Sequence, residues 1–199
     1  PTASFVKLPG SVCGHLAAVE LPDGCFVDYE GEIAVVIGMP ARDVAPDEVD
    51  RVVAGLCLAN DVSCRDAPTT HLVLAKGAPG FCPLGPALVT LDEVRLDDVA
   101  YTVSVNGEER QRAHTRDMVH PVRAVVSSYS RALPLRPGDV ILTGSPGGVG
   151  IALDPPRALQ PGDTVEVASP QLGRLANTFV AGVTGDEAAH RRTAAPTST

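Results

Sequence analysis

The chain contains the acidic segment Asp28-Tyr29-Glu30-Gly31-Glu32, which runs directly into the apolar stretch Ile33-Ala34-Val35-Val36-Ile37-Gly38. A β-branched stretch of this length is typical of a strand, in which alternate side chains share a face. The pattern predicts that the carboxylates of Asp28, Glu30 and Glu32 lie on one side of that strand. Close like charges repel and are costly to bury, so either a hard divalent cation holds them together or they decorate a solvated strand end.

Length and composition indicate one domain that binds a small polar molecule. The chain has 199 residues, 44% of them hydrophobic, and a net charge of -8 with no basic cluster, which argues against nucleic acid and anionic membranes as partners. Its apolar runs are of strand length and too short to cross a bilayer, so no membrane partner is expected. We expect a domain over residues 1–185 and a disordered tail over 186–199, which is rich in Ala, Thr, Arg and Pro.

The cysteines are odd in number, and no two have the two-residue gap of a zinc knuckle or a redox pair. We therefore expect mostly buried, reduced thiols. No apolar signal segment opens the sequence, since the first residues include Lys7 and Pro9, so the expected location is the cytoplasm. The cysteines are Cys13, Cys25, Cys57, Cys64 and Cys82.

Many turns and few helices predict an α+β fold. Gly and Pro, 19 and 18 residues, divide the chain into short pieces. Apolar residues at helical spacing predict packing helices over Pro46–Leu56 and Val119–Leu133, and Asn106-Gly107 predicts a hairpin. Helices and strands do not alternate as in a doubly wound parallel sheet. Strands are expected at Leu16–Val19, Ile33–Ile37, Ala87–Val89, Tyr101–Val105, Val140–Leu142, Thr164–Val167 and Arg174–Val180.

A glycine-rich segment, Leu142–Gly150, follows the predicted strand Val140–Leu142. It lacks the Lys-Ser/Thr ending of a phosphate-binding loop, and the residues after it, including Pro155 and Pro156, do not favour a regular helix. It is either a plain turn or a loop whose N–H groups, with a hydroxyl of Thr143 or Ser145, hold an anionic ligand oxygen.

The chain resembles the C-terminal catalytic domain of the fumarylacetoacetate hydrolase family over roughly residues 5–183. The resemblance rests on an ordered series of short motifs, each weak alone. It implies a mixed β-roll or β-sandwich with a few packing helices, usually dimeric, that binds Mg²⁺ or Mn²⁺ through Glu30, Glu32 and Asp61. Asp28 then stands outside the metal shell and supports it. The motifs are Phe5–Pro9, Asp28–Glu32, Ala59–Asp66, Lys76, Phe81–Pro86, Asn106-Gly107, Thr115–Met118, Leu142–Gly150 and Pro161–Asp163.

The resemblance also implies roles for neighbouring residues. Lys76 matches the family's active-site lysine, and Arg65 either binds a substrate oxygen or anchors the nearby acids. The histidine best placed in sequence to reach the site is His71. The alternative is that His71 lies in a surface loop and has no part in catalysis. The loop residues Thr143, Gly144 and Ser145 are the candidates for binding substrate.

Three carboxylates on an octahedral cation leave positions at which a 2-oxo acid can chelate. Cleaving the bond beyond the keto group leaves an enolate, whose charge the metal stabilises. The same device serves acylpyruvate-type hydrolysis, decarboxylation of a 3-carboxy-2-oxo acid, and 2-oxo acid isomerisation or hydration.

Two departures from the family pattern keep a second class of function open. Relatives usually carry a lid with a His and a Glu that activate water, and this sequence shows no counterpart of that His, which weakens hydrolysis relative to decarboxylation. The segment Gly77–Gly80 is smaller and more apolar than in relatives, and Ala67 and Pro68 replace polar positions. The alternative to an enzyme is a binding or partner subunit that keeps the metal site as a structural brace.

Overall fold

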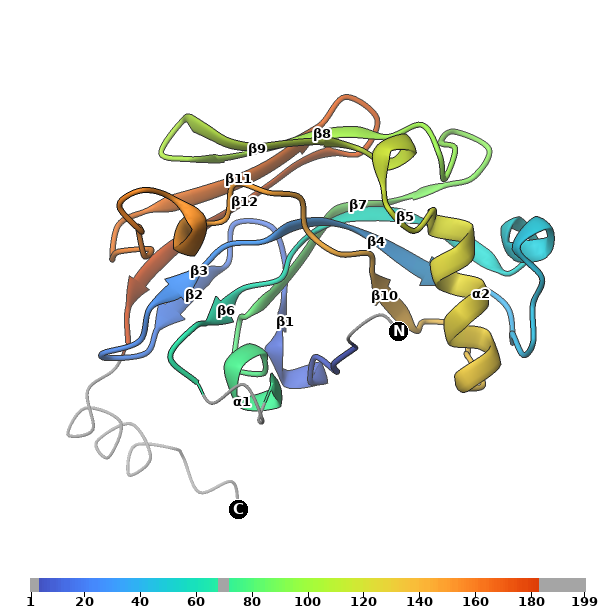
Figure 1. The fold of residues 1–199 in the computed structure, drawn as a ribbon, viewed down its shortest axis with the longest axis horizontal. Helices are drawn as coiled ribbons and strands as arrows, with labels where there is room; N and C mark the ends of the chain where they lie inside the picture. Colours follow the sequence, from blue (N-terminus) through green and yellow to red (C-terminus); the bar gives the residue numbers. More distant parts are fainter. Residues whose placement is uncertain (1–3, 68–71, 183–199) are drawn as a thin grey trace, which may run out of the picture.

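The computed structural model describes residues 4–67 and 72–182, and these form a mainly β structure (Figure 1). Two five-stranded sheets, in the orders β1-β7-β5-β4-β10 and β2-β12-β11-β8-β9, form two layers, and β3 pairs with β6 in a separate ladder. The α+β prediction is confirmed, while the predicted tail lies outside the described residues. The strands are β1 (Val12–Cys13), β2 (Ala18–Leu21), β3 (Val27–Asp28), β4 (Gly31–Ile37), β5 (Val53–Asn60), β6 (Ser63–Cys64), β7 (Cys82–Thr90), β8 (Ala100–Val105), β9 (Glu108–His114), β10 (Val140–Leu142), β11 (Thr164–Ser169) and β12 (Gly173–Ala181).

The helices are few and short, as the sequence predicts. Helix α2 (Val122–Ala132) lies within the predicted Val119–Leu133 and buries Val122 and Val126. Helix α1 (Leu72–Lys76) lies on the side of the β4-β5-β7 sheet that faces away from β8 and β9, and β1 is the edge strand beside β7 (Figure 1). The 3-10 helices are Pro9–Ser11, Pro46–Arg51, Thr115–Asp117 and Gly150–Ala152.

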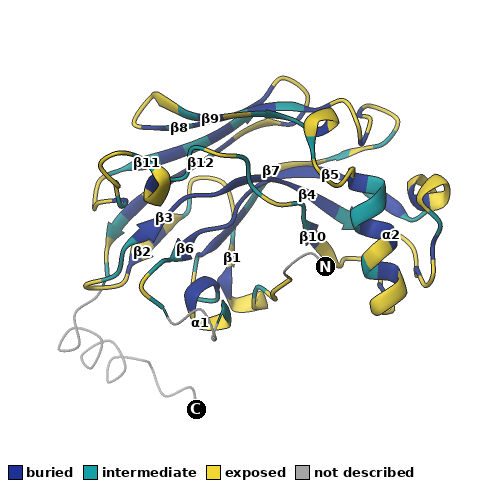
Figure 2. Ribbon diagram, in the orientation of Figure 1, coloured by how far each residue is buried: buried dark blue, intermediate teal, exposed yellow. Residues whose placement is uncertain are grey.

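The core fills the space between the two layers, and the central strands are the most deeply buried parts of the chain (Figure 2). Gly31 is where strand β4 comes nearest to the other sheet. A Cβ at this position would lie 2.1 Å from Cγ2 of Val103 in β8, and the Gly31 carbonyl accepts a hydrogen bond from Tyr101 at 3.3 Å. Only glycine allows this approach, which fixes the start of β4 beside the acidic residues.

The predicted helix over Pro46–Leu56 is wrong beyond Arg51. A 3-10 helix covers Pro46–Arg51, and strand β5 begins at Val53. The helically spaced valines misled the prediction because β5 lies between β4 and β7 and is buried on both faces, so it carries apolar residues without strict alternation. Gly55 marks the strand's close contact with β7, since a Cβ there would lie 2.2 Å from the Val89 carbonyl oxygen.

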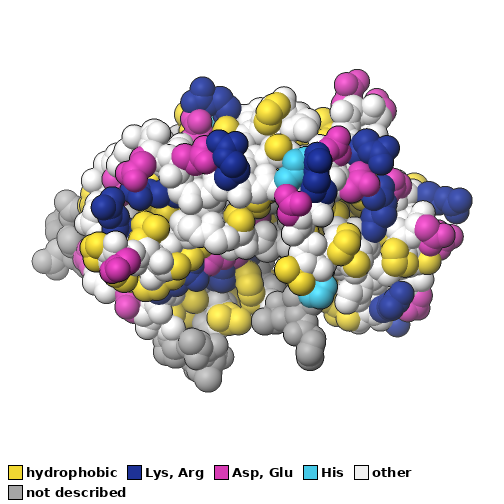
Figure 3. Space-filling view, turned by 45° about the horizontal axis from the view of Figure 1, so that its top comes forward, with side chains coloured by type: hydrophobic (Ala, Val, Ile, Leu, Met, Phe, Trp, Pro, Cys, Tyr) yellow, Lys and Arg dark blue, Asp and Glu magenta, His cyan; other side chains and the backbone are white. Residues whose placement is uncertain are grey.

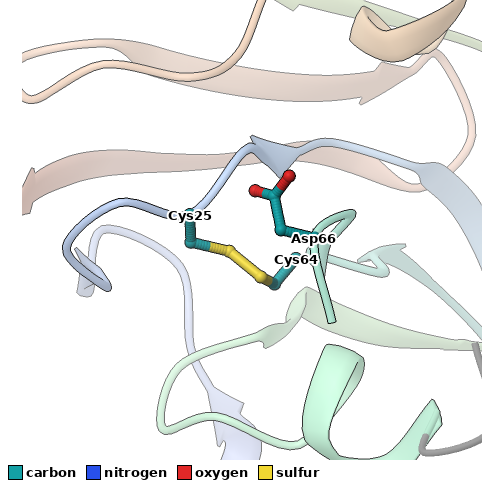
Figure 4. A group of neighbouring side chains, drawn as sticks. All are labelled: Cys25, Cys64 and Asp66. Atoms are coloured by element: carbon teal, nitrogen blue, oxygen red, sulfur yellow. A yellow bond between two sulfur atoms is a disulfide. The ribbon is translucent and has the colours of Figure 1, made fainter. Parts of the chain in front are cut away.

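The prediction of mostly reduced thiols is wrong for two of the five cysteines. Cys25 and Cys64 form a disulfide that ties the start of β3 to β6, while Cys13, Cys57 and Cys82 are free (Figure 4). Asp66 lies beside the disulfide and accepts a hydrogen bond from the Phe26 N–H. The two sulfur atoms bond to each other, so this group offers no thiolate pair to a metal.

Removing this disulfide is expected to destabilise the protein. The bridge spans a sequence separation of 39, and closing a loop of that length in the unfolded chain corresponds to about 4 kcal/mol. We expect the variant Cys25→Ser/Cys64→Ser to lose this amount in urea unfolding at equilibrium. The variant Cys57→Ser is the matched control, and equal stability of wild type and double variant would contradict the prediction.

Charged side chains of both signs interleave on the face drawn in Figure 3, with no large area of one sign. This distribution agrees with a sequence that has no basic cluster. None of the helices within residues 4–67 and 72–182 has the length and apolar character that crossing a membrane requires.

Candidate active site

Three carboxylates meet where strands β4 and β5 pair. Glu30 lies between β3 and β4, Glu32 is in β4, and Asp61 follows the last residue of β5. The Asp61 N–H donates to the Glu30 carbonyl at 2.8 Å, and the Asn60 side chain accepts from the Glu30 N–H at 3.0 Å, so the two strand ends are joined. One oxygen from each carboxylate lies within 4.8 Å of the others, and all three residues are buried. We call Glu30, Glu32 and Asp61 the carboxylate cluster.

Asp28 is not part of this cluster, which corrects the expectation that three acids share one strand face. The backbone pairing is interrupted at Tyr29 and Glu30, so Asp28 ends β3 and Glu32 belongs to β4. The cluster therefore combines two acids of the opening segment with Asp61 from the next strand, as the family resemblance implies.

Lys76 reaches the cluster from the last residue of helix α1. Its Nζ lies 3.1 Å from Oε2 of Glu30, 2.6 Å from Oδ2 of Asp61 and 2.7 Å from the Ser63 hydroxyl. Lys76 is thus a buried residue of the site and not a surface lysine. Phe5 covers it, with Nζ 4.4 Å from the centre of the aromatic ring.

A second lysine, Lys7, contacts the cluster, although no role is predicted for it from the sequence. Its Nζ lies 2.7 Å from Oδ1 of Asp61 and donates to the Val62 carbonyl at 3.0 Å. The sequence held one hint of this contact. Lys7 and Lys76 are the only lysines among its 199 residues, and the other strongly basic side chains are all arginine. Both lysines lie at this one site.

Arg65 joins the cluster to Asp28. Its guanidinium lies 2.9 Å from Oδ2 of Asp28 and 2.6 Å from Oε1 of Glu30. Of the two roles considered for Arg65, substrate binding and anchoring of the nearby acids, these contacts match the second. A quarter of its side chain is exposed, so it also faces the space around the cluster.

The glycine-rich loop passes the cluster after β10 and does not continue into a regular helix, as predicted. The Gly144 N–H donates to Oε2 of Glu32 at 2.6 Å, and the Ser145 hydroxyl lies 3.5 Å from Oε2 of Glu30. The Thr143 hydroxyl instead donates to the Ile33 carbonyl at 2.9 Å, so this residue holds the loop on β4. Gly144 and Ser145 are therefore the loop residues nearest the cluster.

His71 lies outside the described residues. Two other histidines make their contacts away from the cluster: His15 accepts a hydrogen bond from the Ala176 N–H, and Nε2 of His114 lies 3.3 Å from Oδ1 of Asp98. The structure thus brings together Glu30, Glu32, Asp61, Lys76, Arg65, Gly144 and Ser145 of the predicted site.

The cluster has the chemistry of a site for a hard divalent cation. Burial, and then the neighbouring Asp61, raise the pKa of Glu32 to about 8, so this acid ionises at neutral pH only with additional positive charge nearby. Oδ1 of Asp61 is buried and makes no hydrogen bond of good geometry within the described part of the chain, although Lys7 is near. All three donors are carboxylate oxygens, which Mg²⁺ and Mn²⁺ prefer.

The raised pKa of Glu32 predicts a pH dependence of stability in the metal-free protein. The unfolded chain loses this proton near the ordinary value of 4.5, whereas the folded chain keeps it up to about 8. Between these values the unfolded state binds fewer protons, so the free energy of unfolding falls as the pH rises. Each unit of separation contributes about 1.4 kcal/mol.

We expect Glu32→Gln, measured in chelator by urea unfolding, to gain stability relative to wild type as the pH rises from 5 to 8. The variant keeps the shape of the side chain but has no proton to lose. A difference that stays constant across this range, or that changes in favour of wild type, would contradict the assignment.

Comparison with known proteins identifies close relatives. The family model described as fumarylacetoacetate (FAA) hydrolase, C-terminal, matches residues 1–180. A crystal structure of a probable 2-hydroxyhepta-2,4-diene-1,7-dioate isomerase from Mycobacterium abscessus superposes with a TM-score of 0.86 at 40% identity, covering 90% of this chain and 70% of that one. The fumarylacetoacetate hydrolase of Exiguobacterium antarcticum gives 0.84 at 39% identity, covering 89% and 65%.

Two further relatives bear on the metal and on the extent of the match. Maleylpyruvate hydrolase from Sphingobium sp. SYK-6, solved with manganese(II) and pyruvate, gives a TM-score of 0.81 at 32% identity, covering 90% of this chain and 64% of that one. An uncharacterized protein of Staphylococcus epidermidis is 38% identical over 176 residues, which are 86% of this chain and 58% of the relative. The chain thus spans less than two thirds of the length of that relative.

Proposed function

Because the chain belongs to the fumarylacetoacetate hydrolase family, we propose that it acts as a divalent-metal-dependent enzyme that cleaves a carbon–carbon bond next to a 2-oxo acid group. The observation that carries the proposal is the carboxylate cluster: three buried acids, each with one oxygen within 4.8 Å of the others, beside two lysines and an arginine. The metal is Mg²⁺ or Mn²⁺. The relative that contains manganese and pyruvate supports this choice of cation and of substrate class.

The charges of the site favour an anionic substrate once a cation is present. Lys7, Lys76 and Arg65 contribute three positive charges, against the carboxylates of the cluster and Asp28. Four ionised acids and these three cations leave one negative charge, which a divalent cation converts into one positive charge. A 2-oxo acid carries a carboxylate that such a site attracts.

A bound divalent cation supplies the Lewis acid that polarises the keto group and stabilises negative charge on its oxygen. Glu30, Glu32 and Asp61 hold this cation, and Lys76 holds two of them in place through its ammonium group. The Ser145 hydroxyl, 3.5 Å from Oε2 of Glu30, lies where it can donate to a substrate oxygen, while the Gly144 N–H orients Glu32. In decarboxylation the bond beyond the keto group would break with release of CO2; in hydrolysis water would add to the acyl carbon, which would leave as a carboxylic acid. In both cases the electron pair would pass to the 2-oxo acid fragment, and a proton would then return to its carbon.

Two reactions follow from this arrangement, and one experiment distinguishes them. We expect Mn²⁺- or Mg²⁺-dependent loss of ultraviolet absorbance with either acylpyruvates or oxaloacetate, abolished by chelator. Loss of oxaloacetate without acylpyruvate cleavage selects decarboxylation, and acylpyruvate cleavage selects hydrolysis. If neither class is turned over with metal present, the catalytic proposal fails in favour of a binding or partner subunit.

A further inference from the structure

We propose that Asp28 is a positioning residue, whose carboxylate holds the loop over residues 143–151 and the Arg65 side chain in fixed places beside the carboxylate cluster. The inference rests on the proposed function, because the loop and Arg65 are the parts of that site proposed to face the substrate. Strand β3, which ends in Asp28, lies beside the loop that contains the 3-10 helix Gly150–Ala152 (Figure 1).

Every acceptor site of Asp28 is used inside the protein. The residue is fully buried, and its Oδ1 accepts the N–H of Gly150 at 2.7 Å and that of Tyr29 at 2.9 Å. Its Oδ2 accepts the N–H of Ile151 at 3.1 Å and Nε of Arg65 at 3.0 Å. A carboxylate has about four such positions, so Asp28 has none left for a metal.

The acidic segment holds the loop at successive points along its length. Glu32 accepts from Gly144, the Tyr29 hydroxyl donates to the Gly148 carbonyl at 2.9 Å, and Asp28 accepts from Gly150. The two segments therefore run side by side in opposite directions. Asp28 fixes the far end of the loop, and through it the end that carries Gly144 and Ser145.

Two glycines let the loop pack closely against its neighbours, one of them against Asp28. A Cβ on Gly150 would lie 2.8 Å from Oδ1 of Asp28 and 2.2 Å from the Arg157 carbonyl oxygen. A Cβ on Gly148, whose φ is +98°, would lie 2.1 Å from the Arg110 carbonyl oxygen. Gly150 thus lets the backbone approach the carboxylate directly, and Gly148 lets the loop pass close to the Arg110 backbone.

Losing the carboxylate has a specific consequence. The N–H groups of Gly150 and Ile151 lose their acceptors, and Arg65 keeps only Glu30. The three acids of the cluster keep their positions, because Glu32 lies in β4 and the hydrogen bonds between Glu30 and residues 60–61 join the ends of β4 and β5. We therefore expect loss of loop order and of substrate affinity, with little change in affinity for the cation.

The test compares Asp28→Asn with wild type by amide hydrogen exchange of the metal-free full chain. Exchange at Gly150 and Ile151 is expected to accelerate about 10-fold or more, with no change in β11 and β12. In the same variant the Kd for Mn²⁺ should stay within about threefold, while the Kd of the Mn²⁺-loaded protein for oxalate, a chelating probe, rises about 10-fold.

Gly150→Ala is a second variant that pushes the loop away from Asp28 and leaves the carboxylate in place, so it tests the inference even if Asp28→Asn does not fold. It should give the same local exchange and the same loss of oxalate affinity. Asp163→Asn is the matched control, because that carboxylate accepts the Gln160 N–H at 2.8 Å and the Asn106 amide at 2.7 Å in a different loop.

The inference is overturned if Gly150 and Ile151 exchange at the wild-type rate, if exchange accelerates equally in both sheets, or if oxalate affinity is unchanged. Failure of the proposed function looks different. In that case wild type itself binds neither Mn²⁺ nor oxalate, while the exchange measurement still decides whether Asp28 holds the loop.

Discussion

Glu32→Ala is expected to lower the metal-dependent kcat/KM for the 2-oxo acid substrate by about 10³-fold or more. Glu32 is 2% exposed and provides one of the three cluster oxygens. Unlike Glu30 and Asp61, it makes no ion pair with a lysine or arginine within the described residues, and its carboxylate accepts only the Gly144 N–H there. Its removal therefore takes away a proposed metal ligand without leaving a cationic side chain unpaired.

The measurement has two parts. Titration with Mn²⁺ followed by electron paramagnetic resonance should show a large rise in Kd, and assays at the highest usable Mn²⁺ concentration should recover only part of the turnover. Glu109→Ala is the matched control, because it removes an exposed glutamate that pairs with Arg112 in the same strand, β9, on the sheet that does not carry the carboxylate cluster. If the Glu32→Ala variant bound Mn²⁺ with wild-type affinity, Glu32 would not be a metal ligand.

Lys76→Met is expected to destabilise the metal-free protein by about 4 kcal/mol and to abolish turnover. Its ammonium lies 3.1 Å from Glu30 and 2.6 Å from Asp61, and its side chain is 8% exposed. Methionine matches the length of the lysine stem and packs well against an aromatic ring such as Phe5. The substitution therefore removes the positive charge while keeping most of the packing. The buried carboxylates of Glu30 and Asp61 are then left with less positive charge to balance them.

Saturating Mn²⁺ should restore much of this stability, because a divalent cation supplies the missing positive charge. Urea unfolding with and without Mn²⁺ measures both effects. Lys76→Arg is the matched control: it keeps the charge, so its metal-free stability should lie nearer to wild type. If Lys76→Met were as stable as wild type in chelator, the ammonium would not be balancing these acids.

The sequence predicted the parts of the site that depend on local pattern. Residues 33–37 lie within β4, because β-branched side chains pack well on the pleated surface of a sheet. The hairpin at Asn106-Gly107 is confirmed, with φ of 52° and 82°, because both residues tolerate the left-handed conformation that the turn requires. The assignment of Glu30, Glu32 and Asp61 to one cluster came from the family resemblance.

Long-range features could not be predicted from pattern. The contact of Lys7 with Asp61 joins residues 54 positions apart, and nothing in either segment alone indicates it. The Cys25–Cys64 pairing is one of several that five cysteines allow. Residues 53–56 form a strand and not a helix because β4 and β7 provide partners on both edges, which is a property of the assembled sheet.

The scarcity of lysine has a practical consequence for protein chemistry. Lys7 and Lys76 are the only side chains of this protein that carry a primary amine, and their exposed fractions are 9% and 8%. Dyes, crosslinkers and resins that couple through lysine therefore find side-chain targets only beside Asp61. The extent of such labelling reports how far this region opens, and attachment to surfaces should use another chemistry.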